Sequence, residues 1–323
     1  MNYKKGIIVL FLVCISQTSL GQKAVPTSVN KNTIVSNNSK NSVKKSITNL
    51  RSSHPKVALV NTSILRQSKS RKSEAKKLSG SFVISRSSGL YNLKNGNKYD
   101  GMDYSTSLGY KIGPGSLSSG ISYTQNLNDT DGESSTINDS NLKYSLEPRK
   151  IILGSTAVNV DWGASASAII PFSKKSREVD QLQTALILAT NLTLVASDEL
   201  AVSGLGFSLG VSAGQNFHSF QTDKNGNYLN KNSSNQSISF FYSLNKIRFL
   251  VSYANKIRWA YQGEVRNSFE FSQDITWSFL DFWTAELGHT NSGSALKPNG
   301  MDSNLSVIDE DNSIVYLGLS YSF

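Results

Sequence analysis

The sequence predicts an all-β chain that closes into an antiparallel up-and-down barrel of about twelve strands. From residue 79 onward, runs of residues alternate between apolar and small or polar types, which is the period-two pattern of a β-strand. The connections between these runs alternate between short and long. The second face of the runs is built mainly from Gly, Ser, Thr and Asn and carries few charges. These three observations favour a barrel with one apolar and one weakly polar surface.

Each predicted strand is defined by its alternating run and by the turn residues that bound it. In the run 205–213, for example, Leu, Phe, Leu, Val and Ala occupy the odd positions, and Gly and Ser occupy the even ones. The twelve predicted strands are 80–91, 101–112, 117–127, 139–147, 155–171, 183–195, 199–217, 235–244, 246–258, 266–279, 282–292 and 312–323.

The connections divide into two sets that alternate along the chain. The short set comprises 113–116, 148–154, 196–198, 245 and 280–281. The long polar set comprises 92–100, 128–138, 172–182, 218–234, 259–265 and 293–311. Short turns at one end, long loops at the other and an even strand number are typical of a barrel that crosses a membrane.

The last strand carries the sharpest signal. Val315, Leu317, Leu319, Tyr321 and Phe323 share one face, and small or polar residues dominate the other. A terminal strand of this kind resembles the C-terminal signature of Gram-negative outer-membrane β-barrels as a class, in which the assembly machinery reads a terminal Phe and the alternating apolar residues before it. The resemblance covers residues 79–323, implies that Leu319, Tyr321 and Phe323 form the assembly signal, and indicates no specific family.

The composition of the second face separates a membrane barrel from a secreted soluble β-protein, which is the alternative reading. A soluble sandwich needs charged side chains on its solvent face, whereas the second face here suits a crowded or water-filled lumen. We therefore expect a transmembrane barrel whose apolar face meets lipid.

The N-terminal 78 residues have a different character. Lys4 and Lys5 precede an apolar run of about ten residues, 6–15, which is typical of a signal peptide over 1–21 and too short for a transmembrane helix. Cys14, the only cysteine, lies inside this run. Residues 22–78 hold 13 Lys or Arg and one acid, a net charge of +12. We expect a disordered, low-complexity periplasmic tail, followed by the barrel at 79–323.

This distribution of charge argues against nucleic acid as a partner. The whole chain carries +10, of which the tail supplies +12 and the two signal lysines +2, so residues 79–323 carry −4. The basic character thus belongs to the tail and not to the folded domain.

Charged residues within the strands indicate the lumen. An outward charge near the membrane centre costs about 2–4 kcal/mol, so charges in strands are expected to face inward. Extending the alternation of the terminal strand predicts these pore-lining residues: Lys111, Lys143, Asp161, Arg248, Lys256, Glu270, Asp274 and Glu286. They either line a pore with weak ion preference or pair across a closed lumen.

Catalytic and metal sites are not predicted. Outer-membrane lipid hydrolases place His and Ser two residues apart on one strand face, but Ser292 follows His289 by three, which puts the two side chains on opposite faces unless a bulge intervenes. The three histidines are scattered, and the calcium-like loop 128–133 fails at its first and twelfth ligand positions. We expect no catalytic residues, no metal and no cofactor.

The sequence favours an outer-membrane channel that passes small hydrophilic solutes by passive diffusion. Two alternatives stay open: a closed, anchoring barrel whose basic tail binds an anionic periplasmic partner, and, less favoured, a lipid hydrolase around His289. The expected partners are outer-membrane lipids and lipopolysaccharide, the barrel-assembly machinery and the solutes, and we expect a monomer.

Overall fold

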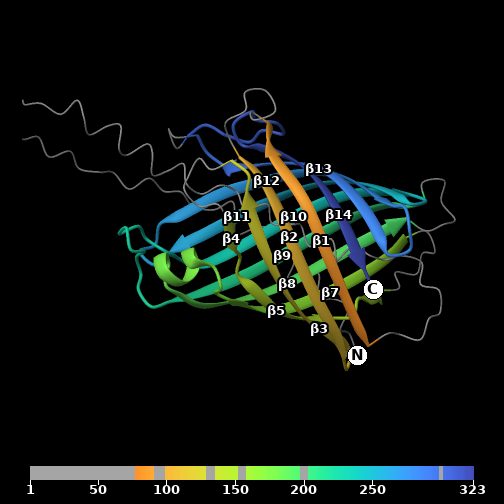
Figure 1. Ribbon diagram of the computed structural model, residues 1–323, viewed down its shortest axis with the longest axis horizontal. Coiled ribbons are helices and arrows are strands. Elements are labelled where there is room, and N and C mark those ends of the chain that lie inside the picture. The colour runs from red at the N-terminus through yellow and green to blue at the C-terminus, as the bar shows by residue number, and fades with distance from the viewer. Residues whose placement is uncertain (1–76, 91–98, 129–134, 152–157, 197–202, 298–300) are drawn as a thin grey trace, which may run out of the picture. The chain divides into compact units, whose positions relative to one another are not determined.

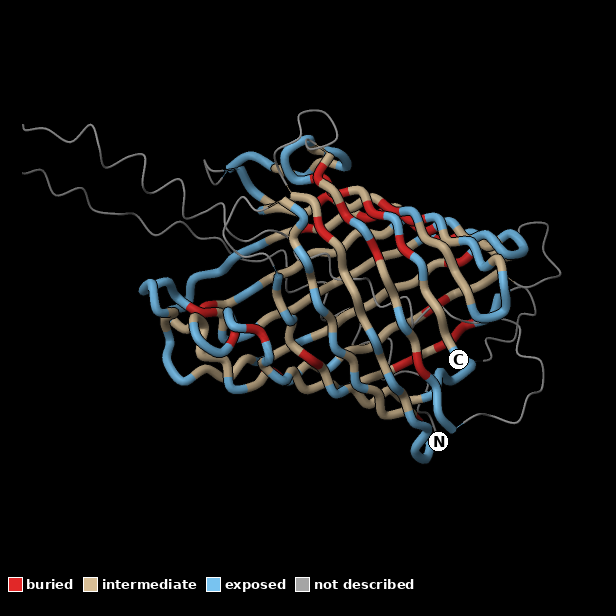
Figure 2. Tube along the Cα trace, viewed as in Figure 1, coloured by how far each residue is buried: buried red, intermediate tan, exposed pale blue. Residues whose placement is uncertain are grey.

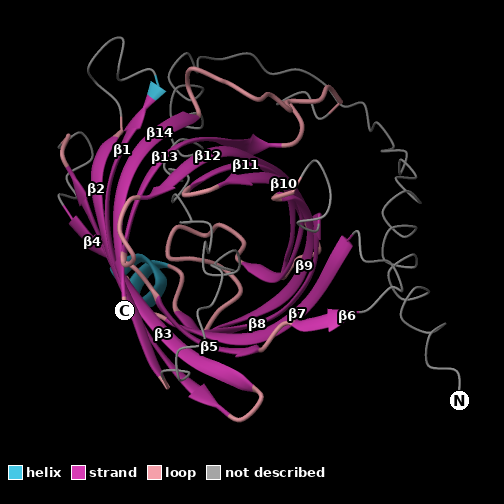
Figure 3. Ribbon diagram, turned by 90° about the vertical axis from the view of Figure 1, so that its right-hand side faces the viewer, coloured by secondary structure: helices cyan, strands magenta, loops and turns pink. Residues whose placement is uncertain are grey.

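The computed structural model describes residues 77–90, 99–128, 135–151, 158–196, 203–297 and 301–323. These residues form long antiparallel strands around a single ring (Figure 1; Figure 3). The strands are β1 Leu78–Gly89, β2 Asp100–Ile112, β3 Gly115–Asn126, β4 Ser135–Ile137, β5 Ser140–Leu146, β6 Arg149–Ile151, β7 Val158–Ile170, β8 Leu182–Ala196, β9 Leu205–His218, β10 Asn230–Leu244, β11 Ile247–Ala260, β12 Val265–Ser278, β13 Trp283–Ser294 and β14 Ser313–Ser322. A short π-helix, η2, spans Lys175–Val179.

The ring is closed, and it has twelve strand positions. The first strand pairs with the last, with Phe82 opposite Tyr321, so no edge is left between them. The short strands β4, β5 and β6 share one position, because β4 and β5 pair with β3 while β5 and β6 pair with β7. Each of the remaining positions holds one long strand. The predicted twelve-stranded antiparallel barrel is therefore confirmed.

The two faces of the barrel are inverted relative to a water-soluble domain. The large exposed hydrophobic residues fall on the outward face of the strands, and Leu188, Phe240 and Leu317 are examples from three of them. Many of the buried polar residues, such as Ser85 and Ser272, fall on the inward face. Figure 2 shows that most of the wall is intermediate or exposed, with buried positions scattered along it. The core of this protein is a polar interior inside an apolar wall.

Tight turns at one end of the barrel need residues that adopt positive φ. Gly113 joins β2 to β3 at a φ of 56°, and Asn245 joins β10 to β11 at 54°. Glycine adopts this region without strain, and asparagine tolerates it better than most residues. Gly204, at a φ of 87°, precedes β9 in the same way. None of the described helices is long and apolar enough to cross a membrane.

Most strand boundaries differ from the sequence-based prediction by one to three residues, and three differences are larger. The predicted strand 199–217 begins later, at Leu205, because Gly204 turns the chain there. The predicted strand 235–244 extends back to Asn230. The predicted strand 139–147 is one member of the divided position β4–β6. The predicted signal peptide 1–21 and nearly all of the tail 22–78 lie outside the described residues; Leu78, assigned to the tail, begins β1.

Candidate functional site

The inward face of the barrel is lined with hydroxyl groups that bond across neighbouring strands. The Oγ atoms of Ser81 and Ser107 lie 2.7 Å apart, and those of Ser252 and Ser272 lie 2.6 Å apart. A similar pair joins Thr193 to Ser208 at 3.1 Å. Because these side chains are small, they leave the barrel interior open to larger inward groups. Charged side chains and a few aromatic ones, such as Phe241 and Tyr316, are among these larger inward groups.

All eight residues predicted to line the pore occupy the face opposite to the exposed hydrophobic residues. The strand registers place them beside small or polar inward residues, for example Lys143 beside Ser118 and Asp161 beside Thr193. The eight are Lys111, Lys143, Asp161, Arg248, Lys256, Glu270, Asp274 and Glu286. Their role in lining a conducting path stays a prediction.

Two of the predicted lysines form ion pairs. Lys256 Nζ lies 2.5 Å from Glu270 Oε2, which joins the adjacent strands β11 and β12. Lys111 Nζ lies 2.6 Å from Glu147 Oε1, across the short-turn end of β3. Both pairs therefore connect residues of the same stretch of wall. They do not bridge opposite walls of the barrel.

Asp274 and Glu286 come together through a tyrosine that the sequence analysis did not single out. The Tyr316 hydroxyl donates to Asp274, and it lies 3.3 Å from Glu286 Oε1. Gly288, between them in the ladder, has no side chain to obstruct this contact, and a Cβ there would collide with both Tyr316 and Asp274. The cluster crosses β12, β13 and β14 and places two carboxyl groups at one site on the inward wall.

Arg248 has a different environment. Its guanidinium carbon lies 4.0 Å from the centroid of the Phe241 ring, on the adjacent strand β10. An aromatic face attracts a cation through its quadrupole, so this contact helps to hold the arginine against the wall.

The sequence analysis missed further inward polar residues, although the same alternation rule would have found them. Asp103 accepts a hydrogen bond of 2.6 Å from Thr124 and one of 3.3 Å from Ser87. Arg258 lies on the inward face of β11, two positions after Lys256. The inward face thus carries both signs of charge.

Loops meet at the end of the barrel opposite the C-terminus, where η2 and the β9–β10 connection lie within the outline of the ring (Figure 1; Figure 3). Asp139 receives the backbone N–H of Ser173 at 2.9 Å and the hydroxyl of Ser176 at 2.5 Å, and so fixes the start of η2. Lys224 N–H donates to the Val179 carbonyl at 3.2 Å. These bonds tie the η2 segment to the β9–β10 connection.

We call this end of the barrel, formed by η2 and the β9–β10 connection, the mouth. The pKa values of two carboxylates at the mouth are shifted in opposite directions. Burial, together with the nearby charges of Asp223 and Asp139, raises the pKa of Asp180. Burial alone would also raise the pKa of Asp223, but hydrogen bonds from Asn227 and Asn225 lower it. Asp223 therefore holds its own turn as an anion, whereas Asp180 retains a proton to higher pH than usual.

The His289 region does not assemble a hydrolase site. β13 pairs without a bulge from Trp283 to Ser294, with His289 opposite Gln273 and Ser292 opposite Glu270. His289 and Ser292 therefore face opposite sides of the wall, as the spacing predicted. Neither buried ring nitrogen of His289 has a hydrogen-bond partner among the described residues.

Metal ligands do not gather in the described part of the chain, where no group of three His, Cys, Asp or Glu side chains is suitably placed. The acidic run 309–311 forms a turn. Asp309 Oδ1 accepts the N–H of Asp311 at 2.9 Å, and Oδ2 accepts the Asn312 side chain at 2.7 Å. Most of the calcium-like loop, 129–133, lies outside the described residues.

The C-terminal strand places its predicted signal residues on the outer wall. Leu319 and Phe323 are exposed, and the Tyr321 ring lies 5.1 Å from the ring of Trp283. Phe323 and Gly80 exchange two backbone hydrogen bonds of 3.1 Å, and the phenyl ring of Phe323 lies over Gly80, where a Cβ would collide with it. The terminal residue thus completes the closure of the ring.

No protein-family model and no curated protein matches this chain. Among solved structures, the chain is similar to the KdgM porin, with 9% identity, 75% of this chain and 99% of that chain covered, and a TM-score of 0.42. It is similar to the NanC porin, with 11% identity, coverage of 75% and 98%, and a TM-score of 0.44. It is also similar to the outer membrane channel DcaP of Acinetobacter baumannii, with 10% identity, coverage of 76% and 96%, and a TM-score of 0.37.

Proposed function

We propose that this protein is a passive channel for small hydrophilic solutes in the outer membrane of a Gram-negative bacterium. The observation that carries this proposal is the inversion of the barrel, with a polar, charged interior inside an apolar wall. Residues 1–21 act as the signal peptide, and residues 22–78 lie in the periplasm.

The membrane location follows from the outer wall. Large hydrophobic side chains are exposed around the ring, among them Leu188, Phe240 and Leu317. Soluble proteins rarely expose such a continuous apolar surface, whereas a closed barrel in lipid needs one. The lipids and lipopolysaccharide of the outer membrane are therefore the partners of this face. The terminal residues Leu319, Tyr321 and Phe323 form the signal for the assembly machinery.

A conducting lumen is favoured over a closed one by the arrangement of the charges. Lys256 pairs with Glu270 on the next strand, and Lys111 pairs with Glu147 across β3 at the short-turn end. Charges that pair along the wall do not close the interior, as pairs across it would. The hydroxyl-lined strands between them suit water and uncharged polar solutes.

The mixed charge of the interior implies weak ion selectivity. Rings of one charge sign give channels a strong ion preference. Here acidic residues such as Glu270 and Asp274 share the interior with basic residues such as Lys143 and Arg248. Small neutral solutes are the substrates that this interior favours. Transport needs no catalysis and no cofactor, and one chain closes the whole ring, so a monomer suffices.

A second candidate function rests on the charge of the tail. Residues 22–78 carry +12, while residues 79–323 carry −4. In this alternative the barrel is a closed anchor, and the tail binds an anionic partner in the periplasm. A tail that enters the lumen and plugs it is a variant of the channel proposal.

Swelling of liposomes that contain the full chain tests the channel proposal. Vesicles loaded with an impermeant polymer are diluted into isotonic arabinose, glucose or sucrose, and light scattering is followed. A channel gives fast swelling that slows as the sugar becomes larger. Protein that is folded by circular dichroism but gives no swelling with any sugar would instead favour the anchor, provided that deletion of residues 22–76, which leaves β1 intact, does not restore swelling. Restored swelling would identify the tail as a plug.

A further inference from the structure

The β13–β14 loop, described at residues 295–297 and 301–312, lies on the outside of the barrel. Asn291 on the outward face of β13 donates its side-chain amide to the Ser306 carbonyl at 2.8 Å and to Ser306 Oγ at 2.9 Å. Asn304 reaches back to the Ser294 carbonyl at 3.2 Å. These bonds attach the loop to the wall.

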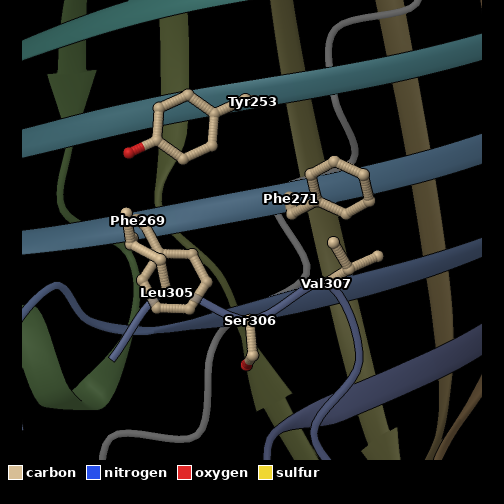
Figure 4. Close-up of a pocket in the computed structure, with 6 residues that line it drawn as sticks. All are labelled: Tyr253, Phe269, Phe271, Leu305, Ser306 and Val307. Atoms are coloured by element: carbon tan, nitrogen blue, oxygen red, sulfur yellow. The ribbon is translucent and has the colours of Figure 1, made fainter. Parts of the chain in front are cut away.

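The loop covers an aromatic part of that wall. Tyr253 of β11 and Phe269 and Phe271 of β12 have the same outward orientation as the exposed Trp277. Leu305 and Val307 of the loop lie over them, and together with Ser306 these residues line a cavity of about 130 Å³ (Figure 4). Almost all of the cavity surface is therefore carbon.

The size and chemistry of this cavity suit a segment of hydrocarbon chain. The cavity is open on one side, and a volume of about 130 Å³ has room for a few carbons of a longer chain. A drug-sized ligand needs at least about 300 Å³. The cavity lies on the lipid-facing surface, where acyl chains are the surrounding solvent.

The loop exposes apolar residues beyond those that line the cavity. Met301 is 87% exposed, and Leu305, Val307 and Ile308 are also exposed. Exposure of these apolar side chains to water would be unfavourable. Beside the acyl chains of an outer leaflet, the same side chains extend the apolar surface of the barrel. Several polar groups of the segment are bonded within the protein, as a lipid environment requires: the Ser306 carbonyl by Asn291, and the Leu305 N–H by Ser303.

We propose that the β13–β14 loop and the outward aromatic residues of β11 and β12 form a clasp for one fatty acyl chain of an outer-leaflet lipid. The clasp holds a short segment of the chain against Phe269 and Phe271, and the rest of the chain continues along the open wall. This inference requires a membrane-embedded barrel but is independent of whether the lumen conducts.

Photochemical labelling from within the bilayer tests the clasp. The full chain is reconstituted in vesicles of phosphatidylethanolamine and phosphatidylglycerol that contain a small fraction of phosphatidylcholine with a diazirine on one acyl chain. After irradiation, mass spectrometry maps the labelled peptides. We expect labelling concentrated at 305–307 and around Phe269 and Phe271, well above that of the exposed outward residues of β8, such as Leu188.

A pair of matched variants tests occupancy. Val307→Trp fills the cavity and is expected to abolish most of the label at Phe269 and Phe271. Leu188→Trp adds the same side chain to the outer face of β8, four strands from β12, and is expected to leave that label unchanged. Even labelling over the whole outer wall of the unsubstituted protein would overturn the proposal, and that map does not depend on the variants folding.

Discussion

Phe269 and Trp277 point to the same side of β12, yet Phe269 is 3% exposed and Trp277 is 53% exposed. The difference arises because the β13–β14 loop covers the first residue and leaves the second open. The outer wall is therefore not uniform: one end of β11–β13 carries a covering segment, and the other end is bare.

Removing the amide that attaches this loop is expected to release it without opening the barrel. Asn291→Ala deletes two hydrogen bonds to Ser306 and should cost about 1–3 kcal/mol of loop stability. Hydrogen exchange of the 303–307 amides should accelerate, while exchange in β12 stays slow. Thr290→Ala, one position away on the inward face, is the control. Equal exchange in the two variants would contradict the role of Asn291.

Neutralising Lys256 and neutralising Glu270 are expected to shift the ion selectivity of the channel in opposite directions. Lys256→Gln leaves Glu270 without its partner at 2.5 Å and should shift the reversal potential in a salt gradient toward cation preference. Glu270→Gln should shift it toward anion preference. Both variants keep the approximate shape of the side chain, so each serves as the control for the other. Shifts of the same sign, or none, would remove these residues from the conducting path.

The orientation of the wall is testable with two adjacent residues of β8. Leu188 faces outward and is 66% exposed, while Ala189 faces inward. Leu188→Arg should destabilise the barrel by about 2–4 kcal/mol, because a charge near the centre of the membrane loses its hydration. Ala189→Arg places the same charge in the polar interior and should cost much less. Urea unfolding in lipid vesicles measures both, and equal costs would contradict the inverted barrel.

The mouth should loosen as pH rises above the acidic range. The pKa of Asp180 is raised above its ordinary value of 3.8 by burial, so the folded loop binds this proton more tightly than the unfolded chain does. The resulting stabilisation is complete below the ordinary value and is lost as pH rises through the raised pKa. Protection factors of the 175–181 amides, corrected for intrinsic exchange, should fall over this interval.

Asp180→Asn should flatten that pH dependence. Asp223→Asn is the contrasting control, because the pKa of Asp223 is lowered by the bonds from Asn227 and Asn225. Its stabilisation is present above the ordinary pKa and is lost as pH falls. If the pH dependence of these protection factors is unchanged in the Asp180→Asn protein, another group at the mouth titrates.

The strand pattern was accessible from the sequence because a residue's face depends only on its position along its own strand. Alternation in β12 places Glu270 and Asp274 on one side and Trp277 on the other without knowledge of any neighbour. The same rule applied to β2 would have found Asp103. Closure also followed, since a final strand with an apolar outer face needs a partner, which the structure identifies as β1.

The contacts between strands were not accessible in the same way. The Tyr316 cluster depends on the register of β12, β13 and β14, which no single strand encodes. The path of the β13–β14 loop also does not follow from the sequence, which predicts only a long polar connection over 293–311. This loop contains four exposed apolar residues, which is consistent with contact with an apolar surface, but their spacing matches neither a strand nor a helix. They are Met301, Leu305, Val307 and Ile308.

Single-channel conductance of the refolded full chain in a planar bilayer, before and after a bulky water-soluble thiol reagent, tests the open polar lumen most directly. Ser239 and Phe240 are adjacent in β10 and face inward and outward respectively. In a background in which Cys14 is replaced, we expect steady conductance that the reagent reduces in the Ser239→Cys protein and leaves unchanged in the Phe240→Cys protein. Folded protein that never conducts, whether residues 22–76 are present or deleted, would contradict a channel through this barrel, and so would a response that is the same for both cysteines.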